Sequence, residues 1–344
     1  MMKALVAHEF GGPEKLRIES VDEPTIEAES NKVLVKVKAC GICYHDLITL
    51  AGKVPWAKLP LILGHEVAGE VIKVGGRVST VSAGDRIASL QRLPCGICKF
   101  CKASRENLCK GVFLGEDLPG GFAEYVVVNE NAVVKLPPTI PYVKGSILAC
   151  AIGTNLRALR DRANVQPGDT VLVTGAGGGL GIHCIQVAKL YGARVIAVTS
   201  SAHKVEKIQE VGADEVILSP NYKFSQEVKR LTQEEGVNIV AEIAGSVSFE
   251  ESLRSLAPGG KIVLIGDPPV EPVQLRLPYV IYKEIEIIAS ASTTRSTLLD
   301  VVNFVKQGLI KPVVSQTYRL EEAAEAFSAL RDKRLIGRVV FKLE

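Results

Sequence analysis

Four cysteines lie close together in one segment of the chain, and their spacing is typical of a metal site. They are Cys95, Cys98, Cys101 and Cys109. Two residues separate Cys95 from Cys98 and Cys98 from Cys101, so their thiolates can face one point, and Cys109 supplies the fourth ligand. The segment therefore predicts a tetrahedral structural zinc site in which the protein fills all four positions. Gly96 permits the tight turn between the first two ligands. The alternatives are a loop closed by disulfides or without metal, and a zinc module that binds nucleic acid.

Three further residues could bind metal, but they are scattered along the chain. Cys43 closes an alternating run of buried-type and polar residues that begins at Val33, which is typical of a strand. His65 follows an apolar run, and Cys150 lies far beyond both. Spacing alone cannot join these three residues, and a single cysteine is more often a small buried hydrophobic residue than a ligand.

A glycine-rich segment lies between a strand expected at 170–174 and a helix expected at 181–191. It contains Gly175, Gly177, Gly178, Gly179, Leu180 and Gly181. Glycines let the backbone approach a pyrophosphate, and the free N–H groups at a helix N-terminus attract it. In this strand–turn–helix context the segment predicts dinucleotide binding. Gly266, which follows a later strand, is a further candidate cofactor residue.

The residues after the next expected strand indicate which dinucleotide is bound. An NAD site usually ends this strand with Asp or Glu, which accepts a hydrogen bond from the ribose. This chain has hydroxyls and a lysine there instead, namely Thr199, Ser200, Ser201 and Lys204. With no carboxylate to repel a 2′-phosphate, the sequence favours NADP(H) over NAD(H). The alternative is that Lys204 only solvates the start of a helix.

The pattern of elements changes along the chain. Residues 1 to about 150 contain short strands broken by Gly and Pro, and hold seven of the eight cysteines. From about residue 170, strands alternate with amphipathic helices, which predicts an α/β fold with a doubly wound parallel sheet. The strands are expected at 170–174, 194–198, 215–218, 238–243, 261–265 and 285–289. The tail from 292 predicts two helices and a final strand at 338–342.

Composition limits the classes of function. A chain of 344 residues is long for one hydrophobic core, so two domains are expected. Its 41 basic and 38 acidic residues nearly balance, which favours neither a nucleic acid nor an anionic membrane as partner. We expect neither a signal peptide nor a membrane span, and therefore a cytoplasmic protein. Eight cysteines in such a protein favour metal binding over disulfides.

Several motifs together resemble the zinc-containing medium-chain alcohol dehydrogenases over the whole chain. The motifs are Cys40-Gly41-Ile42-Cys43, Gly64-His65-Glu66-Val67-Ala68-Gly69, the cysteine segment, the glycine-rich turn and the ending Gly337-Arg338-Val339-Val340. Stretches 179–189 and 252–263 are equally similar to quinone and acryloyl-CoA reductases of the same superfamily. The resemblance implies a β-rich GroES-like catalytic domain over 1–153 with a zinc lobe at 95–109. A Rossmann-type domain would follow over 154–291, and 292–344 would return to the first domain.

The resemblance also implies the roles of individual residues. Cys43, His65 and Cys150 would bind a catalytic zinc, with Glu66 as a neighbouring carboxylate or transient ligand. Asp46 would orient His65 through its other ring nitrogen. The remaining implied roles are Thr154 beside the nicotinamide, Arg338 at the pyrophosphate, and Cys40 and Cys184 in packing. Two zinc ions per chain follow.

The chain departs from the family pattern near the first ligand. Many relatives carry a hydroxyl two residues after it, which starts a proton relay, whereas this chain has His45 and then Ile48. Either His45 donates the proton, or the usual alcohol chemistry is weak. The alternative is that His45 is a surface histidine or one that only supports the zinc ligands. Ile48, Trp56 and Leu118 suggest an apolar substrate pocket, although ordinary core packing explains them equally well.

These observations predict an NADP(H)-dependent zinc alcohol dehydrogenase for an apolar, bulky or aromatic alcohol and its ketone or aldehyde. The alternative is a zinc-containing 2-enoyl or quinone reductase that uses NADPH on a C=C bond. A non-catalytic binding protein on the same scaffold is a third reading, which the complete set of ligands disfavours. The resemblance further implies a homotetramer that pairs through the sheet edge near 285–289.

Overall fold

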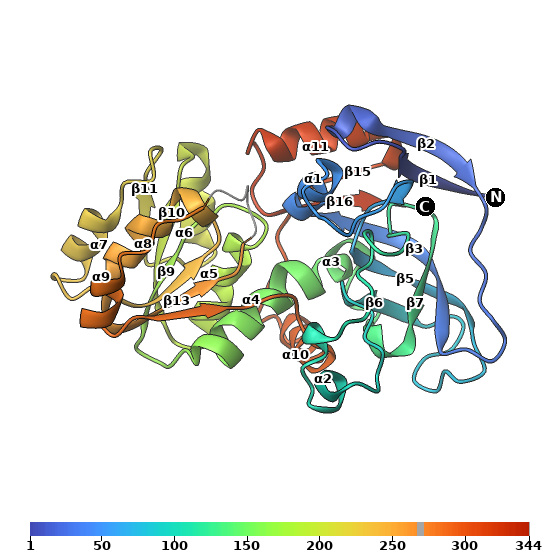
Figure 1. Cartoon of the computed structure of the whole chain (residues 1–344), viewed down its shortest axis with the longest axis horizontal. Helices are drawn as coiled ribbons and strands as arrows, with labels where there is room; N and C mark the ends of the chain where they lie inside the picture. Colours follow the sequence, from blue (N-terminus) through green and yellow to red (C-terminus); the bar gives the residue numbers. More distant parts are fainter. Residues whose placement is uncertain (267–271, 344) are drawn as a thin grey trace. The chain divides into compact units, whose positions relative to one another are not determined.

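The structure is a computed structural model that describes residues 1–266 and 272–343, and the chain divides into two compact units. The first unit contains residues 1–153, 292–308 and 314–344, and the second contains residues 154–291 and 309–313 (Figure 1). The return to the first domain expected over 292–344 therefore lacks 309–313. This piece joins the second unit because the Val313 N–H donates to His183 Nε2 at 2.8 Å and Lys311 bonds with Gln186.

The first unit is built on a seven-stranded, mostly antiparallel sheet with a small three-stranded sheet beside it. The large sheet has the order β15-β16-β3-β5-β6-β8, with β7 paired to β3. Its strands are β3 (Lys32–Ile42), β5 (Glu66–Val74), β6 (Arg86–Ser89), β7 (Tyr125–Asn129), β8 (Val133–Lys135), β15 (Val314–Tyr318) and β16 (Arg338–Lys342). The small sheet contains β1 (Met2–Ala7), β2 (Leu16–Val21) and β4 (Leu61–Ile62). Strand β15 was absent from the sequence prediction.

Strand β3 is the longest strand of this sheet and pairs with three others, β16, β5 and β7. Val33, Val35 and Val37 are fully buried and alternate with partly exposed residues, as the sequence pattern predicted. From Ala39 onward every residue of β3 is buried, so both of its faces are covered, and Phe341 of β16 lies opposite Cys40. Phe122, Phe327 and Phe341 meet edge to face, with ring centroids 4.9 to 6.3 Å apart.

Short helices connect the strands of the first unit. They are α1 (Tyr44–Leu50), α2 (Lys99–Lys102), α3 (Tyr142–Ser146), the π-helix η4 (Leu148–Gly153), α10 (Arg295–Lys306) and α11 (Ala323–Arg331). Helix α10 is amphipathic and is capped by the preceding Thr294, whose hydroxyl accepts from the Thr297 N–H. Helix α11 buries Ala323, Ala326 and Phe327 on one face.

The second unit confirms the predicted parallel sheet. Its six strands have the order β11-β10-β9-β12-β13-β14 and all pair in parallel. They are β9 (Thr170–Val173), β10 (Arg194–Thr199), β11 (Glu215–Leu218), β12 (Val237–Glu242), β13 (Leu256–Leu264) and β14 (Glu286–Ala289). The order reverses between β9 and β12, and ligands bind at such a reversal in doubly wound sheets.

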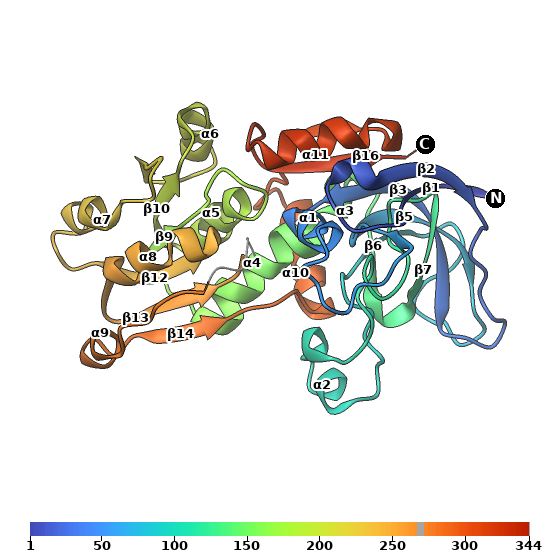
Figure 2. The same ribbon diagram turned by 45° about the horizontal axis from the view of Figure 1, so that its top comes forward.

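Helices cover both faces of this sheet (Figure 2). They are α4 (Thr154–Leu156) with the π-helix η5 (Arg157–Ala163), α5 (Gly181–Leu190), α6 (Val205–Glu210), α7 (Ser225–Leu231), α8 (Phe249–Ser255) and α9 (Leu277–Tyr282). Helices α7 and α8 share one hydrophobic core, in which Phe224 and Phe249 pack against Leu172 of the sheet. Among the described residues, no helix is both long and apolar enough to cross a membrane.

Candidate active site

The first unit brings four predicted site residues into one buried cluster. Ligand atoms of Cys43, His65, Glu66 and Cys150 all lie within 4.8 Å of one another. Glu66 is fully buried and His65 is 3 % exposed, so the cluster is shielded from water. The residues that spacing could not join therefore meet in the fold.

Strand register explains how these residues meet. Cys43 directly follows β3, in which Gly41 lies opposite Glu66, the first residue of β5. On the other side of β3, Ile42 lies opposite Val339 of β16, which places Arg338 beside Cys43. A Cβ at Gly41 would overlap the Glu66 carboxylate, so this close approach requires glycine. The fourth member, Cys150, comes from the π-helix η4, a type of helix that is frequent at functional sites.

Asp46 connects helix α1 to the cluster. One of its carboxylate oxygens accepts from the Cys43 N–H at 2.7 Å, which caps the start of α1. The other oxygen lies 3.3 Å from His65 Nδ1. Asp46 is only 2 % exposed, so it holds both Cys43 and His65 from within the core. This arrangement leaves Nε2 of His65 as the nitrogen directed to the cluster, 3.9 Å from Glu66.

Arg338 neutralises Glu66 inside the cluster. Its Nε and Nη2 donate to the two Glu66 oxygens at 3.1 and 2.5 Å, and Nη2 also donates to Cys150 Sγ at 3.4 Å. Burial raises the pKa of Glu66 and the Arg338 charge opposes that shift. The contact of Arg338 with a pyrophosphate stays a prediction, because the donors described here face Glu66.

The two buried thiols differ in acidity. A hydrogen bond from Cys150 holds the pKa of Cys43 well below its usual value, although burial opposes this. The pKa of Cys150 is raised by the same pairing and by burial. Burial lowers the pKa of His65, but Asp46 outweighs it and the net shift is upward. A thiolate therefore forms at Cys43 most readily, next to a second thiol and an imidazole.

The donor set fits zinc. Two cysteine sulfurs and one histidine nitrogen form a set found in catalytic zinc sites, where a fourth position is left for water or substrate. Glu66 shares the cluster, but its charge is already matched by Arg338. Zinc would stabilise the thiolates and the neutral imidazole that the cluster must present.

The predicted zinc lobe also gathers its four sulfurs. The Sγ–Sγ distances are 3.5 Å for Cys109–Cys95, 3.6 Å for Cys98–Cys101, 3.7 Å for Cys98–Cys109 and 4.0 Å for Cys95–Cys101. A tetrahedron with metal–sulfur bonds of about 2.3 Å has edges of about 3.8 Å, so the spacing fits zinc. All four cysteines are free in the structure, and their sulfurs lie farther apart than the roughly 2.05 Å of a disulfide bond, which favours metal over the disulfide-closed alternative.

The glycine-rich turn of the second unit allows backbone segments to approach one another closely. Gly175 has φ +60°, and a Cβ at Gly181 would overlap the backbone of Gly175 and Ala176, so helix α5 begins directly against the turn. Gly177, Gly178, Gly179 and Leu180 lie between the end of β9 and the start of α5. At the end of β13, a Cβ at Gly266 would overlap the Ile243 carbonyl, so this position too requires glycine.

Residues predicted to bind the cofactor surround this turn. Lys204 is 6 % exposed, and its aliphatic chain lies over Gly177, where a Cβ would come within 2.5 Å of Lys204 Cδ. Thr199 ends β10 and its hydroxyl accepts from the Ser201 N–H, with Ser200 between them. The buried Thr154 hydroxyl has no hydrogen-bond partner among the described residues, and the adjacent Asn155 donates to the Leu180 carbonyl. An unpaired buried hydroxyl beside a glycine-rich turn fits a polar cofactor.

Other predicted residues lie outside these clusters. Cys40 and Cys184 are fully buried and belong to neither metal cluster. Ile48 packs with Val54 and Ala57 in a small core, which supports the packing alternative for this residue. Trp56 is 54 % exposed.

His45 has a partner that the sequence did not indicate. Its Nε2 lies 2.5 Å from Oε1 of Glu116, whose other oxygen accepts from Trp56 Nε1 at 2.7 Å. The His45 ring also meets the His65 ring edge to face, with centroids 5.9 Å apart. Glu116 escaped the sequence analysis because it stands 71 residues from His45 and belongs to no spacing motif. Its only signal was its position two residues before the pocket candidate Leu118.

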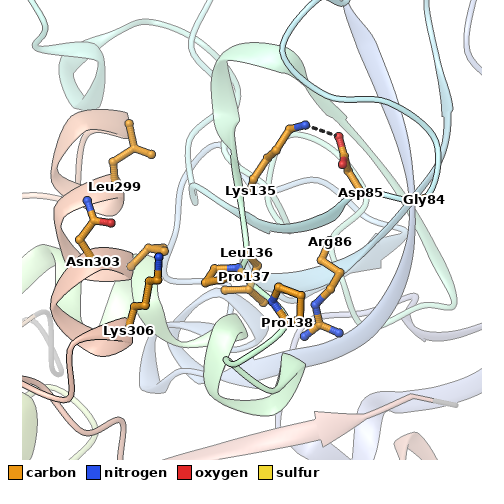
Figure 3. Close-up of a pocket in the computed structure, with 11 residues that line it drawn as sticks. Gly84, Asp85, Arg86, Lys135, Leu136, Pro137, Pro138, Leu299, Asn303 and Lys306 are labelled. Atoms are coloured by element: carbon orange, nitrogen blue, oxygen red, sulfur yellow. Dashed lines mark ion pairs between the residues drawn. The ribbon is translucent and has the colours of Figure 1, made fainter.

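A surface pocket of about 500 Å³ in the first unit contains none of these residues. Figure 3 shows its lining, in which Lys135 pairs with Asp85 at 2.8 Å. Arg86 donates to the Ile140 carbonyl and stacks on Tyr142, so its charge is also engaged. The charges of Asp85, Lys135 and Arg86 are therefore already engaged, which does not indicate a reactive site.

The β-rich unit, the parallel sheet and the two clusters are the features expected of a zinc-binding dehydrogenase, and comparisons with known proteins agree. Residues 29–138 match the alcohol dehydrogenase GroES-like domain, and residues 179–307 match the zinc-binding dehydrogenase family. The chain belongs to the zinc-containing medium-chain dehydrogenase/reductase superfamily of oxidoreductases.

Full-length relatives of two kinds match the chain. It is 40 % identical to an acryloyl-coenzyme A reductase of Metallosphaera sedula, over 98 % of this chain and 99 % of that protein. It is 33 % identical to an NAD-dependent alcohol dehydrogenase of Saccharolobus solfataricus, over 98 % and 99 %. Among solved structures, AibC matches with 41 % identity and a TM-score of 0.92, covering 99 % of this chain and 95 % of that one. An NAD-dependent alcohol dehydrogenase matches over the whole of both chains, with 34 % identity and a TM-score of 0.94.

Proposed function

We propose that this protein is a zinc-dependent alcohol dehydrogenase or carbonyl reductase that transfers hydride between NADP(H) and an apolar alcohol or its ketone or aldehyde. The observation that carries the proposal is the buried cluster of Cys43, His65 and Cys150, with Glu66 neutralised by Arg338. Two thiols and an imidazole can hold zinc through three positions and leave one for substrate.

The mechanism assigns separate tasks to the bound groups and to the chain. When bound, zinc would polarise a carbonyl oxygen and the nicotinamide would supply the hydride. Asp46 fixes the direction of the His65 ring, and Arg338 compensates the Glu66 charge, so the ligand set keeps its charge balance in a water-poor site. In the direction of reduction, one hydride reaches the carbonyl carbon and one proton reaches the oxygen. His45, 23 % exposed at its side chain and next to His65, is our proposed source of that proton.

A second candidate function is reduction of a C=C bond conjugated to a carbonyl. The observation that favours it is the 40 % identity to an acryloyl-coenzyme A reductase, against 33 % to an alcohol dehydrogenase. The missing hydroxyl at position 45 agrees with it. Here the hydride would reach the β-carbon and the proton the α-carbon of the enoyl group, while the carbonyl oxygen takes the same place at the cluster.

Product analysis separates the two functions. Purified protein with measured zinc content is given NADPH and either an aromatic ketone or an acryloyl thioester, and the products are separated by chromatography. The proposal expects alcohol from the ketone with the higher kcat/KM. A saturated thioester as the preferred product would replace it with the second candidate. Absence of turnover with both, in protein that carries two zinc ions per chain, would contradict both functions.

The preference for NADP(H) is supported by Lys204 and the hydroxyls that replace an acidic residue after β10. Lys204 lies over Gly177, within the turn that would hold the phosphates. We expect Lys204→Ala to lower the kcat/KM ratio of NADPH to NADH roughly tenfold, the effect of one lost charged hydrogen bond. Lys207→Ala is the matched control, because the Lys207 side chain is partly exposed and pairs with Glu210. An unchanged ratio in Lys204→Ala would contradict the assignment.

Assembly and compartment complete the proposal. Strand β14 ends the six-stranded sheet and leaves Ile287 38 % exposed, which supports pairing of two subunits through this edge. Two such pairs would form the homotetramer that the family resemblance implies. Free thiols in both metal clusters support a reducing compartment, the cytoplasm. Light scattering of the purified protein tests the tetramer, and a monomer at micromolar concentration would contradict it.

A further inference from the structure

Glu116 is a buried carboxylate that joins two partly exposed side chains near the zinc ligands. Its side chain is 4 % exposed, whereas the His45 side chain is 23 % exposed and Trp56 is 54 % exposed. Each carboxylate oxygen has its own ring partner: Oε1 lies 2.5 Å from His45 Nε2 and Oε2 accepts from Trp56 Nε1 at 2.7 Å. A substrate can therefore touch the two rings but not the carboxylate that holds them.

The turn that carries Glu116 is fixed against the His65 segment. Phe113 and Asp117 bond to each other through two hydrogen bonds of 2.6 and 3.0 Å, and Leu114 pairs with Leu118 across the turn. Gly115 has φ +82°, and a Cβ there would lie 2.9 Å from the Gly64 nitrogen, so the turn packs directly on the residue before His65. The position of Glu116 is thus set relative to the zinc ligand.

The rings around His45 form a connected set. The His45 ring meets His65 edge to face at 5.9 Å, and Phe113 contacts both rings with centroids 5.8 and 5.4 Å away. Thr49 Oγ1 adds a hydrogen bond to Glu116 Oε1 at 3.4 Å. Burial raises the pKa of Glu116, but bonds from His45 and Trp56 outweigh it and the net pKa is lowered. The carboxylate is therefore ionised at neutral pH and can accept from both rings at once.

We propose that Glu116 is a positioning residue that fixes His45 and Trp56 together as one substrate-contacting surface beside His65. This inference rests on the proposed function, which requires a carbonyl compound to bind at the cluster. Glu116 touches no reacting atom itself, since its side chain is only 4 % exposed. Its removal takes from both rings the one charged acceptor that they share.

Trp56 makes the inference measurable without activity, because it is the only tryptophan of the chain. In Glu116→Leu the indole loses its acceptor, so we expect lower fluorescence anisotropy and stronger acrylamide quenching. We also expect kcat/KM to fall roughly 10- to 100-fold, with two zinc ions retained. In Glu116→Gln, the amide can accept from Trp56 and donate to His45, so the fluorescence stays close to wild type and the kinetic loss is smaller.

The control is Glu130→Gln, in the same unit. Glu130 accepts from the backbone of Ser79 and Thr80 and belongs to neither cluster, so its variant should leave kinetics and fluorescence unchanged. Active wild-type protein whose Glu116→Leu variant keeps both kcat/KM and the Trp56 signal would overturn the role of Glu116 alone. An altered Trp56 signal with unchanged kcat/KM would also overturn it, since the contact would then be structural only. Inactive wild-type protein would instead overturn the proposed function, and with it the inference.

Discussion

The two metal clusters of the first unit use similar donors in opposite surroundings. The lobe takes all four sulfurs from residues 95–109, whereas the buried cluster draws Cys43, His65 and Cys150 from three distant parts of the chain. Around the lobe sulfurs the donors are mainly backbone groups, such as the Gly111 N–H on Cys109. Around the buried cluster the partners are charged side chains: Arg338 donates to Cys150 Sγ, and Asp46 accepts from the Cys43 N–H.

We propose that this difference separates a structural zinc site from a catalytic one. Four thiolates with backbone donors complete a tetrahedron and leave no position for substrate. The buried cluster offers three protein ligands, a compensated carboxylate and an oriented imidazole, which is a set that can accept a fourth, exchangeable group. We infer that the side chains around the sulfurs, rather than the number of sulfurs, determine whether a cluster can take part in catalysis.

Substitution of one metal ligand in each cluster tests this comparison, and it has the largest expected effect. Cys43→Ser should lower zinc from two ions to one per chain and reduce kcat/KM roughly 1,000-fold, because substrate polarisation depends on this cluster. Metal analysis and steady-state kinetics on the same preparation check both numbers. A fully active variant with one zinc would place the reaction elsewhere.

The matched variant is Cys98→Ser in the lobe. It should also lose one zinc ion, but keep most of its activity at 25 °C while the free energy of unfolding falls by roughly 3 kcal/mol. Thermal unfolding with and without a chelator measures the loss. Equal loss of activity in both variants would show that the two clusters do not differ as described.

The variant Asp46→Asn tests what one charged carboxylate contributes to the buried cluster. The amide can still cap α1, but the charged partner of His65 is lost, so zinc affinity and kcat/KM should each fall roughly 10- to 100-fold. Chelator competition measures the affinity independently of turnover. Asp85→Asn is the control, because Asp85 forms a half-exposed pair with Lys135 away from the cluster. A wild-type affinity in Asp46→Asn would limit Asp46 to helix capping.

Local patterns allowed much of the fold and one of the two clusters to be predicted. The six parallel strands were found from β-branched runs between helices, and Ile262 and Val263 of β13 are among those buried as expected. The lobe was found from spacing, because its ligands are neighbours in sequence and one glycine, Gly96 at φ +80°, closes the turn.

The buried cluster could be assembled only by resemblance, because register joins its members. Nothing near Cys43 in the sequence indicates that Gly41 lies opposite Glu66, or that Arg338 lies beside Cys43. Glu116 was missed for the same reason, since its partners His45 and Trp56 stand 71 and 60 residues away. Strand β15 was missed because four of its five residues, Val314–Thr317, remain at least partly exposed and show no clear alternation.

The smallest expected effect is a difference in thiol reactivity between the two clusters. Backbone N–H groups of Ile97 and Cys98 lower the pKa of Cys95 to about 6, and Cys95 is exposed, whereas burial raises the pKa of Cys101 to about 12. In zinc-depleted protein, iodoacetamide should therefore modify Cys95 first, at a rate that is flat above pH 7 and falls below about pH 6 as the thiolate is protonated. Cys43 also has a lowered pKa, but it is 7 % exposed, so it should react far more slowly. Peptide mass mapping after short labelling ranks the sites. Labelling of Cys43 as fast as Cys95 would mean that the buried cluster opens to solvent without its metal, and that burial does not separate the two sites.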